Sequence, residues 1–311
     1  NQLISFLGRV NYKFMDKYLL TASYRADGSS RFGDGNRFGF FPSASVGWLI
    51  DEEPFMDDGI FNILKLRASW GQTGNQEIGN YLALSTYNTG DSYVLDDQFI
   101  TVLNPSRIAN KDLKWETTAQ TDIGVDYAIL DNRISGSIAW YRKKTTDMLL
   151  NLPIPSSTGY TSRFVNIGSM ENKGFEFALN THNINAKDFK WNSNINVSTL
   201  KNKVLSLGGV PQIYGGGLPP SPIASAITTP GEPLMSFFGY IVDGIWQEGD
   251  DLTAVSNNVQ PGDFKFRDVN EDGIIDVEDR VILGNSFPEF QWGFTNDFTY
   301  KNFNLNVLFT G

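Results

Sequence analysis

Apolar and polar residues alternate along much of the chain with a period of two. Between residues 3 and 14 the even positions are apolar or glycine, except that tyrosine occupies position 12, while Ser5, Arg9 and Lys13 stand at odd positions. After a short turn at 15–17 the same alternation begins again. A period of two places successive side chains on opposite faces of a β-strand, so these segments are predicted to be strands with one apolar face.

The same alternation recurs, and it predicts about ten strands in all. They cover residues 3–14, 18–27, 38–50, 64–70, 115–130, 134–140, 172–180, 189–200, 291–300 and 303–310. Short turns and a short acidic connection at 51–62 join them at one end. Long connections join them at the other end, at 28–37, 71–114, 143–171 and 201–290.

This segregation of connection length by end is typical of a barrel in a membrane. Strands of about ten residues can cross a hydrocarbon layer at a tilt, and an outer face that never becomes polar suits lipid as its solvent. The predicted fold class is therefore all-β, a portion of an antiparallel transmembrane β-barrel over residues 1–311. Its apolar rows would rest against acyl chains and its polar rows would line a wet interior.

Aromatic residues gather at both predicted ends of the strands. Tyrosine and phenylalanine flank the short turns, at Tyr12, Phe14, Tyr18, Tyr127, Tyr300 and Phe303, and the opposite ends carry Phe38, Trp70, Trp115, Trp140 and Trp292. Rings with a polar edge favour the depth of lipid head groups, so we expect two interfacial girdles. The alternative is a soluble β-sandwich, whose core would also be rich in aromatics but which gives no reason for sorting connections by length.

The amino-acid composition excludes several other classes of protein. The 311 residues include no cysteine, so neither disulfides nor thiolate chemistry is available. The chain has no uninterrupted apolar stretch of about 18 residues, which excludes a helical membrane protein. A net charge of −10 argues against binding to nucleic acid, because phosphate backbones require a basic protein face.

One segment in the longest connection, 268–279, has the spacing of a calcium-binding loop. Oxygen donors occupy its positions 1, 3, 5, 9 and 12, a backbone carbonyl stands at 7, and Gly273 at position 6 permits the sharp turn. The candidate Ca²⁺ ligands are Asp268, Asn270, Asp272, Ile274 through its carbonyl, Asp276 and Asp279. Aspartate replaces the usual glutamate at position 12 and flanking helices are not evident. The alternatives are a solvated turn or a site filled only at millimolar calcium.

The same connection carries an aromatic patch that we predict to contact a protein partner, because exposed aromatics are typical of interfaces. Its residues are Phe237, Phe238, Tyr240 and Trp246. Such rings could equally stack on a carbohydrate. Catalysis has little support: His182 is the sole histidine, which excludes histidine triads, and the carboxylates form no evident pair. No catalytic residue and no further cofactor is predicted, and a surface hydrolase stays the enzyme alternative.

Several motifs resemble those of SusC/RagA-type TonB-dependent outer-membrane transporters, in the C-terminal part of the barrel. They are Trp70-Gly-Gln-Thr-Gly-Asn-Gln76, Asn104-Pro105 followed by Leu113-Lys-Trp-Glu116, Asn132-Arg133 followed by Trp140-Tyr141, Asn166-Ile-Gly168 with Asn172-Lys-Gly-Phe-Glu176, and Gly239-Tyr240 with Gly244-Ile-Trp-Gln247. The motifs follow one another in the same order as in that family, and the resemblance covers nearly the whole chain.

The resemblance implies a 22-stranded barrel that is closed by a plug, with short periplasmic turns and long extracellular loops. It further implies a place in the cell outer membrane of a Gram-negative, Bacteroidetes-like organism. Uptake of oligosaccharides or peptides would be driven by the TonB–ExbB–ExbD complex and assisted by a SusD-like lipoprotein lid. Residues 201–290 would then be a long extracellular loop.

The sequence departs from that pattern because no plug, signal peptide or TonB-contacting region is evident. Ten strands cannot close such a barrel, and an open edge in lipid leaves backbone groups unpaired. We therefore expect the chain to be a portion of a longer polypeptide. Two other functions stay open. A passive porin would conduct ions without TonB, and a calcium-dependent adhesin or lectin-like sandwich would be extractable without detergent.

Overall fold

The computed structural model describes residues 2–57, 59–95, 97–216, 224–250 and 259–311. The chain divides into two compact units. The first comprises Asn1–Lys201 with Pro288–Gly311, and the second comprises Asn202–Phe287.

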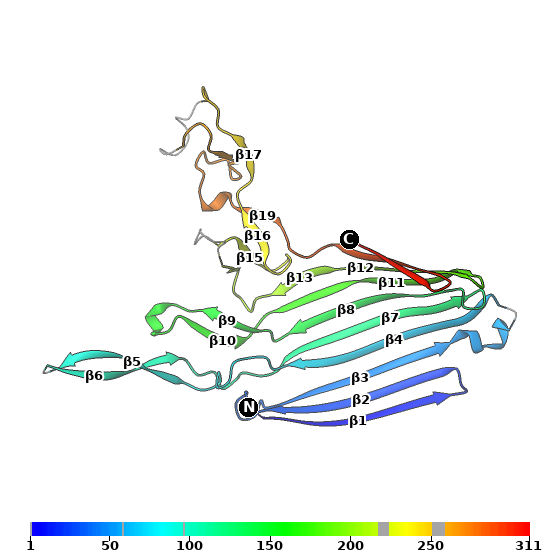
Figure 1. Cartoon of the computed structure of the whole chain (residues 1–311). Coiled ribbons are helices and arrows are strands. Elements are labelled where there is room, and N and C mark those ends of the chain that lie inside the picture. Colours follow the sequence, from blue (N-terminus) through cyan, green and yellow to red (C-terminus); the bar gives the residue numbers. More distant parts are fainter. Residues whose placement is uncertain (1, 58, 96, 217–223, 251–258) are drawn as a thin grey trace. The chain divides into compact units, whose positions relative to one another are not determined.

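The first unit is built on one antiparallel sheet (Figure 1). In the described part of the chain, ten of its strands follow one another in the order β1-β2-β3-β4-β7-β8-β11-β12-β20-β21. Their bounds are Leu3–Phe14, Tyr18–Ser29, Phe38–Leu49, Phe61–Asn75, Glu116–Ile129, Ile134–Thr146, Ser169–Asn185, Phe189–Thr199, Phe290–Tyr300 and Phe303–Thr310. The ten predicted strands are confirmed. Several of them continue beyond their predicted ends into the long connections.

Further elements occupy the connections. Within 71–114 lies a hairpin of β5 (Thr86–Leu95) and β6 (Gln98–Arg107), and within 143–171 lies a shorter pair, β9 (Leu149–Pro153) and β10 (Ser162–Asn166). Short 3₁₀ helices are η1 (Ile50–Glu52), η2 (Pro54–Met56) and η3 (Ser156–Thr158). The sequence prediction did not include either hairpin.

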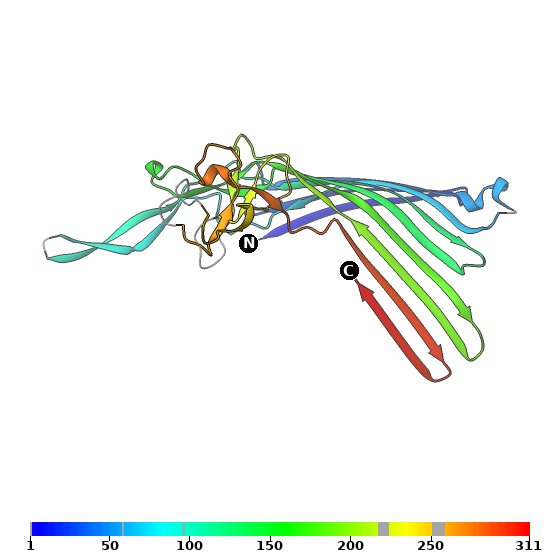
Figure 2. The same cartoon turned by 90° about the horizontal axis from the view of Figure 1, so that it is seen from above.

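The main sheet is a single curved layer whose apolar face is the more exposed one (Figure 2). On β3, Phe40 and Val46 are 56% and 52% exposed, while Ser43 and Ser45 on the opposite face are only half-exposed. The uninterrupted register continues this apolar row from Val46 to Ala68 on β4. Among the described residues, no second sheet packs against these rows. A water-soluble sandwich would bury them, so this arrangement is the reverse of a sandwich and fits a wall in lipid.

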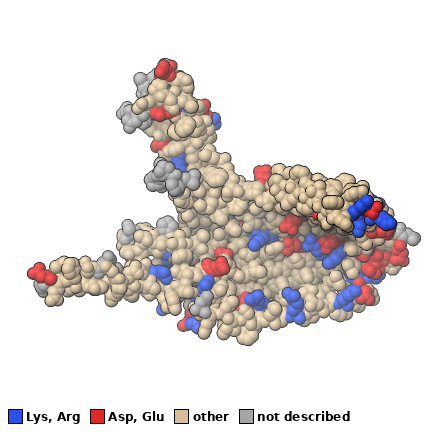
Figure 3. All heavy atoms as spheres, in the orientation of Figure 1, with Lys and Arg blue, Asp and Glu red and all other residues tan. Residues whose placement is uncertain are grey.

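The polar face of the sheet carries ion pairs between neighbouring strands. Arg67 Nε lies 3.2 Å from Asp126 Oδ1, and Lys65 Nζ lies 3.9 Å from the other oxygen of that carboxylate. Within β2, Arg25 also pairs with Asp27 at 2.7 Å. Acidic and basic side chains lie near one another over the strands in the view of Figure 3. This face therefore has the polarity of a water-lined wall.

At the short-turn end, the acidic connection holds two strand residues and one turn residue together. Glu53 accepts hydrogen bonds from Trp48 Nε1 at 2.9 Å, from the Tyr18 hydroxyl at 2.9 Å and from Lys17 Nζ at 3.0 Å. The rings of Tyr18 and Trp48 stack with centroids 6.4 Å apart. An aromatic girdle residue thus keeps its polar edge toward the turn, as the sequence predicted for this end.

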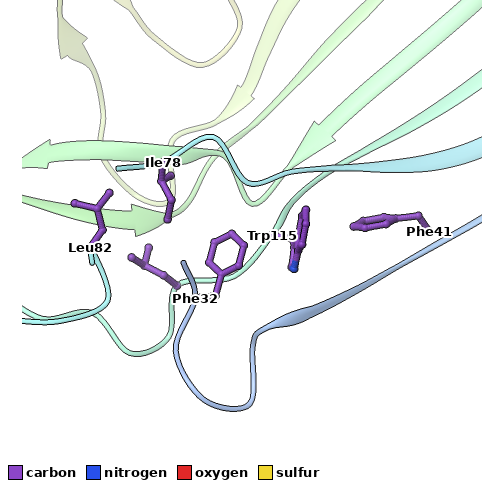
Figure 4. Packing of buried hydrophobic residues seen from close by; sticks show 6 residues of the cluster. Phe32, Phe41, Ile78, Leu82 and Trp115 are labelled. Atoms are coloured by element: carbon purple, nitrogen blue, oxygen red, sulfur yellow. The ribbon is translucent and has the colours of Figure 1, made fainter. Parts of the chain in front are cut away.

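At the other end, residues of three long connections share a hydrophobic cluster, which we call the loop-end core (Figure 4). Its buried members are Phe32, Phe41, Ile78, Leu82, Leu113 and Trp115, with Leu149 and Phe164 packed against them. The prediction that Trp115 belongs to a lipid-facing girdle is wrong, because this side chain is only 7% exposed. Its Nε1 donates to the carbonyl of Arg37 at 2.9 Å, which joins the first long connection to β7.

Several residues of the family-like motifs build this core. A side chain at Gly74 would overlap the ring of Phe41 and come within 2.8 Å of Trp115, so glycine is needed for the close approach. Asn166 bridges two other segments. Its Nδ2 donates to the carbonyls of Lys114 at 2.7 Å and Asp147 at 3.0 Å. These motif residues therefore have a structural role.

The second unit consists of small sheets. One sheet consists of β14 (Ile213–Tyr214), β15 (Ala226–Thr228), β16 (Ser236–Gly239) and β19 (Val281–Gly284). Another consists of β17 (Val242–Ile245) and β18 (Phe264–Phe266). The chain enters the unit through β13 (Lys201–Ser206), and a short 3₁₀ helix, η4, spans Val277–Asp279. Val204, Leu207 and Ile227 are buried in it. In neither unit do the described residues include a helix of the length and apolarity that a membrane crossing requires.

Candidate functional site

An open groove of about 820 Å³ lies in the second unit, between the β17–β18 hairpin and the calcium-like loop. It is lined by Tyr240, Asp243, Trp246, Val259, Asp263, Phe264, Lys265, Phe266, Arg267, Asp268, Gly273 and Ile275. The groove thus brings together two of the four predicted partner residues and the first predicted calcium ligand.

Aromatic rings form much of the groove wall. The centroid of Phe266 lies 5.2 Å from that of Tyr240 and 6.2 Å from that of Phe264, both within the range of favourable ring contacts. Lys265 Nζ lies 4.5 Å from the Trp246 ring centroid, close enough for a cation–π contact. Phe264 is 61% exposed. A ligand in the groove would therefore meet accessible aromatic rings whose positions are fixed by contacts with one another and with Lys265.

A charged pair stands beside these rings. Arg267 contacts both oxygens of Asp243, with its Nη2 2.6 Å from Oδ1 and its Nε 3.1 Å from each oxygen. The guanidinium holds the pKa of Asp243 below its ordinary value, chiefly through these hydrogen bonds. Because the pair is exposed, it adds little stability, and it leaves fixed charges of both signs at the edge of the groove.

Arg280 connects the groove to Phe238, one of the other two predicted partner residues. Its guanidinium carbon lies 4.4 Å from the ring centroid of Phe238 and 5.9 Å from that of Tyr240. Its Nη2 donates to the carbonyls of Ala224 and, at 3.0 Å, of Phe238. Phe237 is exposed on the neighbouring position of β16 and does not line the groove. The structure therefore divides the predicted patch between two adjacent surfaces.

In the 268–279 loop, the four aspartates accept hydrogen bonds from backbone N–H groups. Asp268 accepts from Glu271 and Gly273, each at 2.7 Å. Asp279 has a fully buried side chain and accepts from Val269 at 2.8 Å and Asp276 at 2.9 Å. No group of three or more histidine or acidic residues able to hold a metal occurs among the described residues. Calcium binding by this loop stays a prediction.

Asp279 gives a prediction about pH. Backbone N–H donors lower the pKa of its carboxyl, first that of Asp276. The native state thus holds the ionised form more strongly than the unfolded chain, whose value is about 3.9. The resulting stability is present above that pH and lost as the pH falls through the native pKa. Asp279→Asn should destabilise the loop at neutral pH and remove this part of the acid dependence, as read by hydrogen exchange over residues 268–284.

Asp272→Asn is the matched control, because Asp272 is exposed in the same loop. Equal protection in the Asp279→Asn variant and the parent at neutral pH would contradict the prediction. Added calcium tests the metal prediction in the same measurement, since an ion that binds only the folded loop must increase its protection.

The sequence prediction missed a second exposed surface, the β5–β6 hairpin. Phe99 is 81% exposed there, and Tyr87 and Leu103 are also exposed. A two-stranded hairpin alone is only marginally stable in water, so this one is suited to contact with another surface. The signal that would have revealed it is a pair of segments rich in aromatic and β-branched residues, 93–95 and 99–103, on either side of an Asp-Asp pair.

Comparison with known proteins places the chain in a family. Residues 3–223 match the family described as "TonB dependent receptor-like, beta-barrel". The chain belongs to the TonB-dependent receptor family. Among its curated relatives, TonB-dependent receptor P3 of Formosa agariphila is 38% identical over 99% of this chain, and TonB-dependent receptor SusC of Bacteroides thetaiotaomicron is 35% identical over 98% of it.

Solved structures agree with this assignment. The RagAB peptide transporter matches this TonB-dependent receptor chain with a TM-score of 0.80 and 25% identity over 99% of the chain. The RagAB peptide importer in its closed-closed state matches with a TM-score of 0.81 and 26% identity. The predicted resemblance to SusC/RagA-type transporters is confirmed. The chain spans about a third of these proteins, namely 31% and 30% of the two curated relatives and 33% of each solved chain.

Proposed function

We propose that this TonB-dependent receptor chain forms part of the wall of an outer-membrane importer for large nutrients. The observation that carries the proposal is the distribution of polarity on the main sheet, with apolar rows exposed on one face and ion pairs on the other. Relatives from Formosa and Bacteroides that are named as receptors support it. No catalytic role is proposed.

Import of this kind needs energy from the inner membrane, which we assign to TonB acting through a region of the full protein other than the strands described here. The family name and the names of the relatives support this assignment. The RagAB titles describe a peptide importer, and the cargo that we propose is a peptide or an oligosaccharide. Either class offers polar groups that the charged inner face can hydrogen-bond.

We assign the groove of the second unit to contact with a SusD-like surface lipoprotein. Exposed rings beside fixed charges of both signs are typical of protein interfaces, where aromatics and arginine are enriched. The contact would involve Tyr240, Phe264 and Phe266, with Trp246 held by Lys265. The calcium-like loop lies on the same groove, and a bound Ca²⁺ would stiffen one of its edges.

Import can be tested with the full-length protein in cells that grow on its cargo. Disabling TonB should abolish growth on that nutrient and leave growth on a monomeric nutrient unchanged. Steady ion conductance by the purified protein in planar bilayers, together with TonB-independent growth, would instead show a passive porin and contradict the proposal.

A further inference from the structure

A group of cations lies on the apolar side of the sheet, just beyond the last outward-facing rings of β8 and β11. The register pairs Trp140 with Phe175 and, two positions further toward the long connections, Arg142 with Lys173. Next in the same row, Lys144 is paired with Glu171. No register shift interrupts β8 against β7 or β11 in this region, so these side chains share the face of Trp140.

These cations are accessible and only partly neutralised. The side chains of Arg142 and Lys173 are 52% and 51% exposed. Glu171 receives Arg142 through Nε at 2.7 Å and Nη2 at 2.6 Å, and Lys173 lies 3.5 Å from its other oxygen. One carboxylate against three cations leaves an excess of positive charge, although the whole chain has a net charge of −10.

Like charges placed directly opposite on neighbouring strands are unfavourable. The bridging carboxylate relieves the repulsion between Arg142 and Lys173, and it also fixes the Arg142 guanidinium in one orientation. Each of these cations carries further N–H donors besides those that face Glu171. Such a preformed set of donors suits an anion with several oxygens.

The surface next to the cations is apolar and exposed. Phe175, two residues from Lys173, is 58% exposed, and Ile138 further along the row on β8 is 49% exposed. An acyl chain can lie along these side chains while a charged head group reaches the cations, and basic residues at the edge of an apolar band recognise anionic head groups in this way. A free soluble anion would make no use of the apolar part.

From this juxtaposition we propose that Arg142, Lys144 and Lys173 bind the phosphate of a phosphorylated lipid in the outer leaflet. The inference rests on the proposed function, because the long connections must face outward for these residues to reach that leaflet. It assigns to the outside of the wall a binding site that is separate from cargo and from the lid.

The test uses the full-length transporter in detergent micelles, titrated with bisphosphorylated lipid A and followed by native mass spectrometry. The variant R142Q/K144Q/K173Q should bind about 10- to 100-fold more weakly than the parent, since each cation near a head group contributes to affinity. The matched control is K187Q/K190Q/K301Q, which removes three exposed cations at the short-turn end and should bind normally.

A second variant, R142K/K144R/K173R, keeps the charges and should retain binding within a few fold. Should the glutamine triple variant fail to fold, K144Q alone should still weaken binding about fivefold. Unchanged affinity in the folded glutamine variants, equal binding of dephosphorylated lipid A, or competition by millimolar inorganic phosphate would each overturn the inference. TonB-dependent import by a transporter that fails this test leaves the proposed function standing.

Discussion

Replacing Trp115 with alanine should destabilise the loop-end core by about 3–5 kcal/mol, the range found for removing a buried tryptophan or phenylalanine. The side chain is 7% exposed and contacts rings from two other segments, with centroids 5.4 Å from Phe32 and 5.5 Å from Phe41. The variant also leaves the carbonyl of Arg37 without its indole donor.

The effect should be local, because the transmembrane part of the sheet does not depend on this cluster. Hydrogen exchange in the full-length protein should increase in residues 29–37, 76–84 and 110–115, while the β1–β2 hairpin keeps its protection. Trp70→Ala is the matched control, since Trp70 is an exposed ring on the apolar face of β4. Equal loss of protection in the two variants, or none in Trp115→Ala, would contradict the role given to Trp115.

The strands were predictable because each has a face in a uniform solvent. Where one row of side chains meets lipid and the other meets water, apolar and polar residue types alternate with a period of two. On β3, Phe40 and Val46 lie on the apolar face and Ser43 and Ser45 on the polar one. The turns were also evident. Asp131 and Asn132 adopt positive φ angles of 56° and 62° between β7 and β8, as the sequence suggested for a tight reversal.

The burial of Trp115 was not predicted, because periodicity indicates only which face of a strand a side chain occupies. It gives no information about which other segments cover that face. The position of Trp115 continues the apolar phase of Ile123 on β7, yet its ring is covered by Phe32, from a different connection, and by Phe41, at the loop end of β3. That cover is a tertiary contact between segments about 75 to 85 residues apart, which no local pattern encodes.

The candidate site was only partly predictable for a similar reason. Tyr240, Trp246 and Asp268 were singled out from local composition, but Phe264 and Phe266 enter the site only because β18 pairs with β17 across the segment between them. Arg280 follows the calcium-like motif directly, and its contact with Phe238 joins what the sequence presented as separate features. The groove is thus a product of pairing within the second unit.

The double variant Tyr240→Ala/Phe266→Ala should weaken association of the full-length transporter with its lipoprotein by about 10- to 100-fold, since truncating an aromatic residue of an interface commonly costs about 1 kcal/mol or more and two such losses are expected. The two rings contact each other at 5.2 Å and both line the groove, so their removal deletes one continuous surface. Affinity of the detergent-solubilised partners, measured by surface plasmon resonance, is the readout.

Phe55→Ala is the control, because Phe55 is an exposed ring at the short-turn end, which the proposal places on the periplasmic side. Asp243→Ala separates ring contact from charge: a change mainly in association rate would assign the exposed Asp243–Arg267 pair to steering, since exposed interface charges act chiefly on encounter. Undiminished lipoprotein affinity in the double variant would move the contact elsewhere, and the β5–β6 hairpin with its exposed Phe99 is the surface to substitute next. The lipoprotein affinity of the double variant should fall if the groove is the contact and stay unchanged if the hairpin is. This one measurement therefore decides between the two surfaces, and it does not require the cargo to be known.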